Sequence, residues 1–423
     1  MGHVVNHHRD YRLLQERFDR HVTGAPASPT FTKILELLFT PEEARIARRF
    51  PTIPKPLGTI AERLGMEEEH LSDIVQDLGQ RGLMIDIEHK GKRYAALPPV
   101  VIGFYEYTFM RTRGDAPMEE IAKLFDRYMI EDDRFSRAVF QKQTQIGRSL
   151  VREESLPMDD HIEILDFERA SRVVEQAKAH AVSLCACRHK AEHLGKACDH
   201  DQQNCLSFGS AAEVLIHNGL AERITAAESM QLLEASKEAG LAQTGDNVQK
   251  DLSYICNCCG CCCGMMEAIK TFDINNAIVS SNWIVEIDGE SCTGCGNCEK
   301  ACPVDAIEME KYQAGRRNKQ RAVRNEEVCL GCGICPGECK SGSARMVSRE
   351  QRVFTPEKSF DKYAAMAIER GKIADLIFCD YDSFSHRTLG RLLSVLERSS
   401  PVKALMAIEP LKSSFLNMLV RNR

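Results

Sequence analysis

The sequence predicts a multidomain α+β protein with an N-terminal domain of helices and a hairpin, a helical cysteine-rich middle, a small duplicated βαβ-like unit near residue 300 and a helical C-terminal region. Three observations indicate this fold class. Apolar residues recur at helical spacing in several segments before residue 271. The segment MIDIEHKGKRYAAL alternates around Lys90 and Gly91 as a β-hairpin does. One cysteine spacing occurs twice between residues 292 and 339, and β-rich segments flank each copy.

Composition and length limit the possible classes of protein. The 423 residues allow about two to four domains, and 43% of them are hydrophobic, which is ample for a core. The formal net charge of −6 gives no cationic field of the kind that attracts nucleic acid. No apolar run approaches the ~18 residues of a membrane span, and residues 1–20 lack the apolar core of a signal peptide. We therefore expect a cytoplasmic protein with no membrane span.

The 19 cysteines are the unusual feature of the composition. In a long chain whose start shows no export signal, so many thiols favour metal ligation over disulfides, because the cytosol keeps thiols reduced. Exposed metal–sulfur clusters are oxygen-labile, so we expect an anaerobic or low-potential cytoplasm.

The N-terminal part divides into a polar segment and a compact domain. Residues 1–30 are polar and end in GAPASP, which has the composition of a turn-rich linker. Residues 31–97 then hold FTKILELLF, a helix begun by PEEARIARRF, and a helix–turn–helix with its turn at Gly65. The hairpin follows directly. This order of elements resembles a winged-helix domain, and the resemblance implies either DNA binding or protein docking.

The charges of this domain argue against DNA binding. Residues 31–97 contain ten Lys or Arg and eleven Asp or Glu residues. The second helix of the helix–turn–helix, which would approach phosphates, has Arg81 as its one cation. Its acidic residues are Glu67, Glu68, Glu69, Asp73 and Asp77. We expect a docking or scaffolding domain, while Lys90, Lys92 and Arg93 of the wing keep DNA binding as the alternative.

Residues 98–175 are expected to be helical, because apolar side chains recur on one face at Ile121, Leu124, Phe125 and Tyr128. An aromatic cluster precedes this face. It consists of Phe104, Tyr105, Tyr107 and Phe109. Aromatic residues at such density are typical of core packing, here against the preceding domain.

Residues 176–270 form a cysteine-rich region that we also expect to be helical. Its first four thiols are Cys185, Cys187, Cys198 and Cys205. Four thiols suffice for one cubane cluster or one zinc ion, although zinc ribbons prefer paired C-x2-C units. The neighbouring His189, His193 and His200 are expected to be surface or hydrogen-bonding residues, since the thiolates are already sufficient. Arg188 would either compensate the charge of a thiolate-bound cluster or be solvated.

A second cysteine-rich stretch, YICNCCGCCCGMM, follows within the same region. It contains Cys256, Cys258, Cys259, Cys261, Cys262 and Cys263. Adjacent side chains diverge, so six thiols cannot easily face one metal, but several overlapping C-x2-C registers are available. Gly260 and Gly264 allow a tight backbone. Because free thiols at this density would oxidise readily, we expect metal ligation. A cubane, a non-cubane cluster shared with residues 185–205, a catalytic site and a zinc knuckle all stay open.

The repeated cysteine spacing is the most specific motif of the chain. Both copies read C-x2-C-x2-C-x3-C. The first copy comprises Cys292, Cys295, Cys298 and Cys302, and the second comprises Cys329, Cys332, Cys335 and Cys339. Glycines lie between the ligand positions, where larger side chains would meet the metal group. WIVEID and RAVRNEEV lead into the two copies, and PVDAIEM and SARMVS return from them as strands.

Residues 282–350 resemble a bacterial two-cluster ferredoxin domain. The resemblance implies two 4Fe-4S clusters, and it implies that the fourth cysteine of each copy binds the other cluster. The ligand sets would then be Cys292, Cys295, Cys298 with Cys339, and Cys329, Cys332, Cys335 with Cys302. Pro303 matches the family, whereas Lys340 follows Cys339 and Pro336 follows Cys335, which departs from it. The whole layout also resembles uncharacterised 4Fe-4S proteins of anaerobes, which implies no particular activity.

Residues 351–423 are expected to be a helical C-terminal region. The amphipathic segments SHRTLGRLLSVLER and EPLKSSFLNMLVRNR indicate helices that would cover the preceding domain or dock a partner. Cys379 stands alone in an apolar segment and is expected to be a core residue.

These observations lead to three hypotheses of function. The main one is an electron-transfer protein or redox subunit that passes single electrons between protein partners, or within a larger oxidoreductase complex, through two or more 4Fe-4S clusters. The sequence shows no phosphate-binding glycine motif and no C-x2-C-H, so partners would supply other redox cofactors. The second is a reductase with a catalytic metal site in the loop 256–263. The third is a redox-responsive regulator that uses the winged-helix-like domain to bind DNA.

Overall fold

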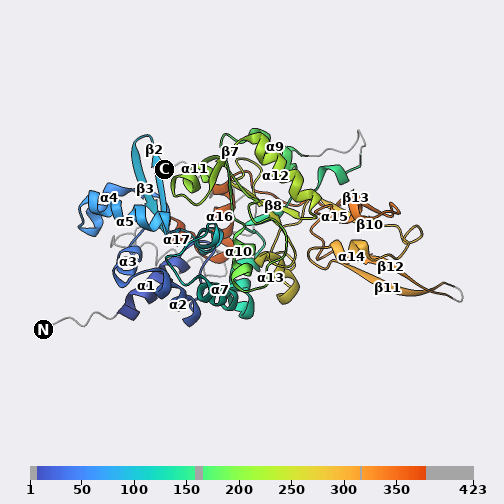
Figure 1. Ribbon diagram of the computed structural model, residues 1–423, viewed down its shortest axis with the longest axis horizontal. Coiled ribbons are helices and arrows are strands. Elements are labelled where there is room, and N and C mark those ends of the chain that lie inside the picture. Colours follow the sequence, from blue (N-terminus) through green and yellow to red (C-terminus); the bar gives the residue numbers. More distant parts are fainter. Residues whose placement is uncertain (1–6, 158–164, 315–316, 378–423) are drawn as a thin grey trace, which may run out of the picture.

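The computed structural model describes residues 7–157, 165–314 and 317–377. Three regions follow one another along the long axis of the molecule (Figure 1). The N-terminal helices lie at one end, a sheet covered by helices occupies the middle, and the region of the cysteine repeat projects at the other end. None of the helices in the described residues combines the length and the apolar character needed to cross a lipid bilayer.

The N-terminal segment is polar as expected, and residues 20–28, which hold most of the expected linker, form no helix or strand, but the described residues before them form a helix that packs into the core. Its side chains Tyr11, Leu14 and Phe18 follow helical spacing and are buried, although the helix is otherwise polar. The Tyr11 hydroxyl donates to the Phe39 carbonyl at 2.8 Å. The helices of this part are α1 (His7–Asp19), α2 (Pro29–Leu38) and α3 (Pro41–Ala47), and Thr40 caps α3 with a complete capping box.

The predicted helix–turn–helix and hairpin both form. Gly65 ends the first helix in the left-handed conformation with φ 68°, and Lys90 and Gly91 form the hairpin turn with φ 51° and 71°. The elements are β1 (Lys55–Pro56), α4 (Leu57–Leu64), α5 (Glu68–Gln80), β2 (Ile85–His89) and β3 (Lys92–Ala96), with the antiparallel strand order β1-β3-β2. The likeness to a winged-helix domain remains a prediction.

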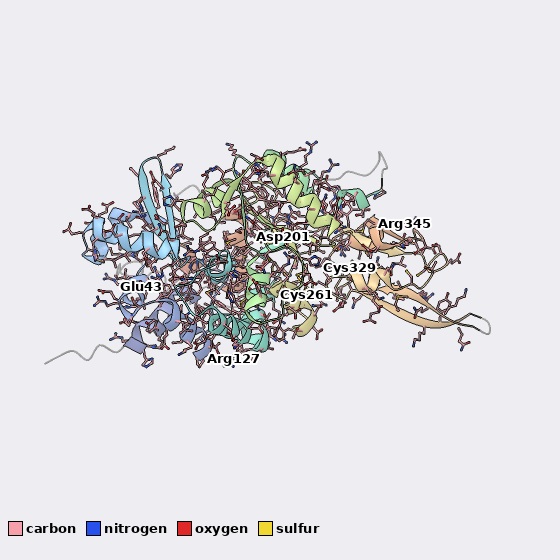
Figure 2. All side chains as sticks on the ribbon, in the orientation of Figure 1. Glu43, Arg127, Asp201, Cys261, Cys329 and Arg345 are labelled. Carbon is pink, nitrogen blue, oxygen red and sulfur yellow. The ribbon has the colours of Figure 1, made fainter. Side chains whose placement is uncertain are left out.

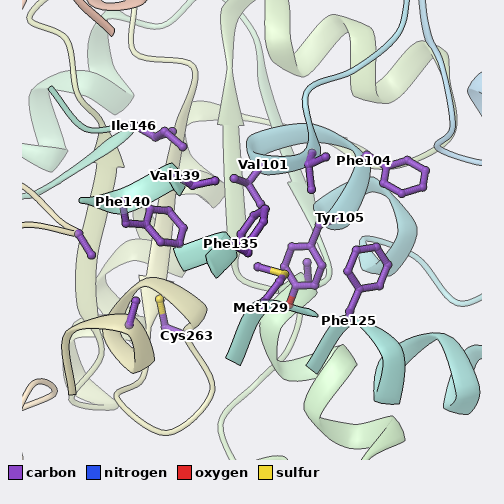
Figure 3. Close-up of a cluster of buried hydrophobic side chains, with 14 of the residues drawn as sticks. Val101, Phe104, Tyr105, Phe125, Met129, Phe135, Val139, Phe140, Ile146 and Cys263 are labelled. Atoms are coloured by element: carbon purple, nitrogen blue, oxygen red, sulfur yellow. The ribbon is translucent and has the colours of Figure 1, made fainter. Parts of the chain in front are cut away.

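The next region is mainly helical, as expected, between residues 104 and 140, whereas residues 101–103 just before it have non-helical backbone angles. Its elements are η1 (Val100–Phe104), α6 (Tyr105–Phe109), α7 (Met118–Asp126), η2 (Arg127–Glu131) and α8 (Asp133–Phe140). Phe104 joins the N-terminal helices to this region, because its ring lies 4.9 Å from that of Phe18 and 6.1 Å from that of Phe125. Figure 3 shows this apolar core continuing past Met129 and Phe135 to Cys263. Two short turns, η3 (Glu153–Ser155) and η4 (Asp166–Glu168), and α9 (Ala170–Gln176) complete the region.

The cysteine-rich middle is built on an antiparallel sheet, so the expectation of a helical middle is wrong. The strands are β4 (Gly147–Ser149), β5 (His180–Ser183), β6 (Cys205–Phe208), β7 (Glu222–Ile224), β8 (Ala242–Asp246) and β9 (Tyr254–Cys258), in the order β4-β8-β9-β6-β5-β7. Helices α10 (Ala186–His193), α11 (Gly209–His217), α12 (Ala226–Glu238) and α13 (Gly264–Phe272) pack around it. The strands are short and bury polar residues such as Gln243 and Asn257, so they lack apolar alternation.

The region of the cysteine repeat contains the four expected strands. They pair between the two copies, β10 (Trp283–Ile287) with β13 (Ala344–Ser348) and β11 (Ile307–Ala314) with β12 (Arg317–Arg324), both antiparallel. A short helix begins after the second cysteine of each copy and contains the third, α14 (Asn297–Ala301) and α15 (Ile334–Glu338). The duplicated unit is therefore present, and its sheets are made by exchange between the halves.

The chain returns to the middle region after the repeat. Helix α16 (Ser359–Arg370) buries Met366 and Ala367 completely, and α17 (Ile373–Ile377) follows it. Figure 1 shows α16 in the centre of the molecule, away from the cysteine repeat. The Lys362 ammonium pairs with the Asp246 carboxylate of β8 in a buried contact. Cys379 and the two amphipathic segments expected near the C-terminus lie outside the described residues.

Candidate metal centres

The eight cysteines of the repeat line two separate small cavities. Three thiols of the first copy and one of the second line the first cavity: Cys292, Cys295, Cys298 and Cys339. The second cavity has the converse set: Cys329, Cys332, Cys335 and Cys302. The antiparallel exchange of strands between the halves produces this crossing, because it brings the end of each copy beside the start of the other.

The glycines of the repeat are required by close backbone packing. Gly294 has φ +70°, and a Cβ there would lie 2.3 Å from the Gln320 carbonyl oxygen. Gly331 has φ +65°, and a Cβ there would lie 2.0 Å from the Trp283 carbonyl oxygen. A side chain at either position would therefore push a strand away from the cysteine loop.

The donor set in both cavities suits an iron–sulfur cluster. Backbone N–H groups point at ligand sulfurs, since Ala306 donates to Cys302 Sγ at 3.2 Å and Ala344 donates to Cys339 Sγ at 3.4 Å. Burial opposes ionisation of Cys339, yet hydrogen bonds from Ser341 and Ser343 lower its pKa to about 7. The unusual Pro336 is accommodated in α15 and leaves Cys339 within its set.

The ten upstream cysteines form two groups that do not follow their order in the sequence. Cys198 lies next to three thiols of the second cysteine-rich stretch and is not grouped with Cys185, Cys187 and Cys205. This four-cysteine group comprises Cys198, Cys259, Cys261 and Cys262, whose sulfurs all lie within 4.8 Å of one another. The remaining six line one wall of a large cavity and are called the thiol wall here: Cys185, Cys187, Cys205, Cys256, Cys258 and Cys263.

The sulfurs of the four-cysteine group are spaced for one tetrahedral metal ion. The Sγ–Sγ distances are 3.6 Å for Cys198 and Cys259, 3.7 Å for Cys261 and Cys262, and 3.9 Å for Cys262 and Cys198. Metal–sulfur bonds of about 2.3 Å at tetrahedral angles place two sulfurs about 3.8 Å apart. Within the described ranges, no three cysteines of the repeat lie as close to one another. A wider spacing is what a cubane requires.

The loop after β9 holds this group together. The Cys263 backbone N–H donates to the Cys259 carbonyl at 3.3 Å, and the Lys270 ammonium donates to the Gly260 carbonyl. Hydrogen bonding by the Cys262 thiol lowers the pKa of Cys259 to about 4 against the effect of burial, and the Arg188 guanidinium acts in the same direction. Cys259 is thus set to be a thiolate, which is the form that binds metals.

The thiol wall is a continuous row of interacting sulfurs. Period-two alternation places Cys256 and Cys258 on one face of β9. Cys205 contacts Cys256, Cys256 contacts Cys258, and Cys258 contacts Cys263. The row then reaches Cys187, which also contacts the Tyr105 hydroxyl. Cys185 stands next to it at the start of α10.

Arg188 lies between the two groups and is completely buried. It is therefore not solvated, which was one of the two expectations for this residue. Its guanidinium donates to the carbonyls of Asp201 at 2.8 Å and Asn257 at 2.6 Å, and to Asn204 Oδ1 at 2.9 Å. A buried cation here offsets the negative charge of nearby thiolates. His189 behaves as a hydrogen-bonding residue, since its Nδ1 lies 2.8 Å from the Phe109 carbonyl.

The second site of the repeat lies directly against the four-cysteine group. A Cβ on Gly260, between Cys259 and Cys261, would lie 2.4 Å from the carbonyl oxygen of Pro303, the residue after Cys302. Arg152 makes a second link, because its N–H donates to the Cys332 carbonyl at 3.0 Å and its guanidinium to the Leu241 carbonyl at 3.2 Å. Figure 2 shows Cys261 on the side of the middle region that faces Cys329. Sequence reasoning did not find this contact, which depends on the tertiary fold.

Known proteins resemble the region of the cysteine repeat. Residues 291–343 match the family model described as a 4Fe-4S dicluster domain. Ferredoxin-3 of Rhodobacter capsulatus is 28% identical over 83 residues, which cover 15% of this chain and 82% of that protein. The methylamine utilization ferredoxin-type protein MauM of Paracoccus denitrificans is 25% identical over 154 residues, which cover 34% of this chain and 69% of that protein. No solved structure matches the chain. Residues 291–343 are therefore a ferredoxin-type 4Fe-4S dicluster domain, a domain that carries two clusters and transfers electrons.

Proposed function

We propose that the protein passes single electrons between redox partners through the two clusters of the dicluster domain and a further cysteine-ligated centre in the middle region. The observation that carries the proposal is the partition of the eight repeat cysteines into two cavities with four thiols each. The proposed ligands are those two sets. Each cluster supplies one-electron redox chemistry when bound, and the chain supplies thiolates, N–H donors and burial.

The contact between Gly260 and Pro303 supports a path into the middle region. It joins the loop of the four-cysteine group to the residue that follows Cys302, with no intervening side chain. On the other side, the exposed Cys295 and half-buried Cys339 bring the first cluster site near the surface, where a partner protein can approach. The order of sites therefore runs from the surface of the dicluster domain to the four-cysteine group and then, through the loop 256–263, to the thiol wall.

The metal of the four-cysteine group decides its part in this path. Its sulfur spacing favours a single ion over a cubane. An iron ion held by four thiolates would carry one electron, whereas zinc would only brace the loop, since Zn²⁺ has no redox chemistry. We propose iron here, because the group stands between the dicluster domain and the thiol wall.

Metal analysis of the anaerobically purified protein tests the proposal. Two 4Fe-4S clusters require eight iron and eight sulfide per chain. We expect at least that sulfide content and more iron than sulfide, because a tetrathiolate iron site adds iron without sulfide. Fewer than eight iron or eight sulfide would contradict the assignment of two clusters. One equivalent of zinc that is lost in a Cys261→Ser variant would contradict the assignment of iron to the four-cysteine group.

A reductase is the second candidate function, and the thiol wall favours it. Six cysteines and a large cavity meet there, which exceeds what an electron carrier needs. This function requires a metal centre on the thiol wall with an open or non-cysteine coordination position. Anaerobic electron paramagnetic resonance and Mössbauer spectra of the reduced protein would show such a centre as a component absent from a Cys256→Ser and Cys258→Ser variant. Spectra that contain only fully thiolate-ligated cubanes would exclude it.

A further inference from the structure

The cavity beside the thiol wall is a distinct feature of the middle region. It has a volume of about 760 Å³ and is lined by the hairpin β2, the turn before α6, α11, the strand β9 and α16. Its rim includes the exposed residues Ser210, Glu213 and His217 of α11, so it has access to solvent. The thiol wall forms part of its interior, together with Tyr105, Met129 and Tyr254.

The cavity is far larger than the two cysteine-lined cavities of the dicluster domain. Those two measure about 10 Å³ and 20 Å³. The cavity beside the thiol wall measures about 760 Å³. Cavities of about 300–1,000 Å³ are typical of sites for small organic molecules.

The charges that line the cavity select the kind of molecule. Four acidic residues lie in the lining, Glu88, Glu106, Glu213 and Asp246, but Glu213 is ion-paired with Arg223 and burial raises the pKa of Glu106 to about 8. Within the part of the chain that the structure describes, the lining holds no arginine and a single lysine, Lys362, whose charge Asp246 already neutralises. An anion would therefore find no unpaired lysine or arginine in the described lining to replace its hydration, so carboxylate, phosphate and sulfonate ligands are disfavoured. Most other lining side chains are aliphatic or aromatic.

We propose that this cavity is a binding site for an uncharged, largely apolar small organic molecule, which lies against the thiol wall. The proposed binding is inferred from the size and the lining of the cavity. The proposed function enters at one point: a metal centre on the thiol wall would exchange electrons with the bound molecule. The site is separate from the two ferredoxin-type sites, which share none of its lining residues.

A pair of probes that differ by one charge tests the proposal on the anaerobic holoprotein. N-phenyl-1-naphthylamine is neutral, and 1-anilinonaphthalene-8-sulfonate has the same rings with an added sulfonate. In equilibrium dialysis we expect the neutral probe to bind with one equivalent per chain and the anion to bind at least about tenfold more weakly. Equal binding of both probes, or no saturable binding of the neutral one, would overturn the proposal.

A matched pair of variants locates the bound probe. Ala211→Trp places a large side chain from α11 into the cavity, and Ala227→Trp places the same side chain on the exposed surface of α12. We expect Ala211→Trp to weaken binding of the neutral probe at least about fivefold and Ala227→Trp to leave it unchanged. Wild-type binding by a folded Ala211→Trp variant would count against the cavity.

Hydrogen exchange of the wild type gives a readout that does not depend on any variant. The neutral probe should slow exchange in residues 99–110 and in α11, and slowing confined to other segments would overturn the assignment. Iron and sulfide are measured in the same samples. Probe binding with fewer than eight iron per chain would contradict only the proposed function, and a full cluster content without probe binding would contradict only the cavity proposal.

Discussion

His21 is a buried neutral histidine at the junction of the N-terminal helices and the C-terminal helices. Burial lowers its pKa to about 3, and the positive charges of Arg17 and Lys372 add to the effect. Its Nε2 is buried, and the Lys372 ammonium donates to its carbonyl at 2.9 Å. An imidazolium at this position would therefore lie next to two cations, Arg17 and Lys372.

This residue should make the N-terminal region acid-sensitive. The folded pKa lies below the unfolded value of about 6.5, so only the unfolded state gains a proton as the pH falls from about 6.5 toward 3, and stability is lost over that window. Between pH 7.5 and 5.5 the wild type should lose about 1.4 kcal/mol relative to a His21→Gln variant. Native-state hydrogen exchange of α1 and α2 in both proteins measures this. Parallel pH dependences in the two proteins would contradict the prediction.

At the scale of elements, helix α16 is fixed to the middle sheet by one buried ion pair. Lys362 and Asp246 are 2% and 1% exposed, and Asp246 also accepts a hydrogen bond from Ser253 at 2.7 Å. A second ion pair, Lys250 with Glu357 at 2.6 Å, joins the same two parts of the chain in solvent. The two pairs differ mainly in burial, so they form a matched comparison.

Loss of the buried lysine should release α16. Lys362→Met leaves the Asp246 carboxylate buried and unpaired, which typically costs about 3–5 kcal/mol, whereas Lys250→Met should cost less than about 1 kcal/mol. Limited proteolysis of the holoprotein should then cut residues 350–358 rapidly in Lys362→Met and slowly in Lys250→Met. Adding Asp246→Asn to Lys362→Met should restore much of the resistance. Equal cleavage of the two single variants would show that the buried pair does not hold the helix.

The arginines of helix α5 and the hairpin are held by carboxylates, and the hairpin packs on the middle region of the same chain. Arg81 is paired with Glu43 at 2.7 Å and Asp77 at 2.8 Å, and Arg93 is paired with Asp86 at 2.6 Å. The Asn218 amide of α11 donates to the Asp86 carbonyl at 2.9 Å, so the domain is docked on the middle region. The exposed acidic residues of α5 are Glu68, Glu69, Asp73 and Asp77.

We therefore predict that this domain does not bind DNA, which is the opposite of what the regulator hypothesis expects. Because the arginines of this domain are held by carboxylates and the exposed face of α5 is acidic, duplex DNA should cause no shift in an anaerobic gel at about 1 µM protein and ~100 mM salt. Oxidised and reduced protein are tested side by side. A shift that weakens steeply as salt is raised, in either redox state, would restore DNA binding as a function.

At the scale of the whole molecule, the features that short sequence patterns determine agree with the structure. Features that depend on residues far apart in the chain could not be predicted from the sequence. The cysteine spacing of residues 292–339 is itself a local pattern, and Pro41, Gly65 and Gly91 mark helix and turn boundaries at or next to their own positions. The middle sheet could not be predicted, because its strands bury polar side chains and cysteines instead of alternating apolar and polar residues. The regrouping of Cys198 with residues 259–262 depends on the pairing of β6 with β9, which no local pattern records.

The joining of the dicluster domain to the middle region is the property of the whole molecule that most directly bears on electron transfer. Gly260→Ala introduces a Cβ that would lie 2.4 Å from the Pro303 carbonyl oxygen, so the two backbones must separate. No ligand is removed, so iron content should be unchanged. Gly337→Ala is the control, because a Cβ there meets nothing within 4 Å.

Electron transfer falls steeply with distance, so Gly260→Ala should slow the reduction of the upstream centre while the dicluster domain is reduced at its normal rate. Rapid-freeze electron paramagnetic resonance after mixing with dithionite follows both centres in one experiment. The Gly337→Ala protein should match the wild type in both phases. If Gly260→Ala retains all its iron and also reduces the upstream centre at the wild-type rate, electrons do not pass through this contact, and the four-cysteine group would be a structural site beside the path.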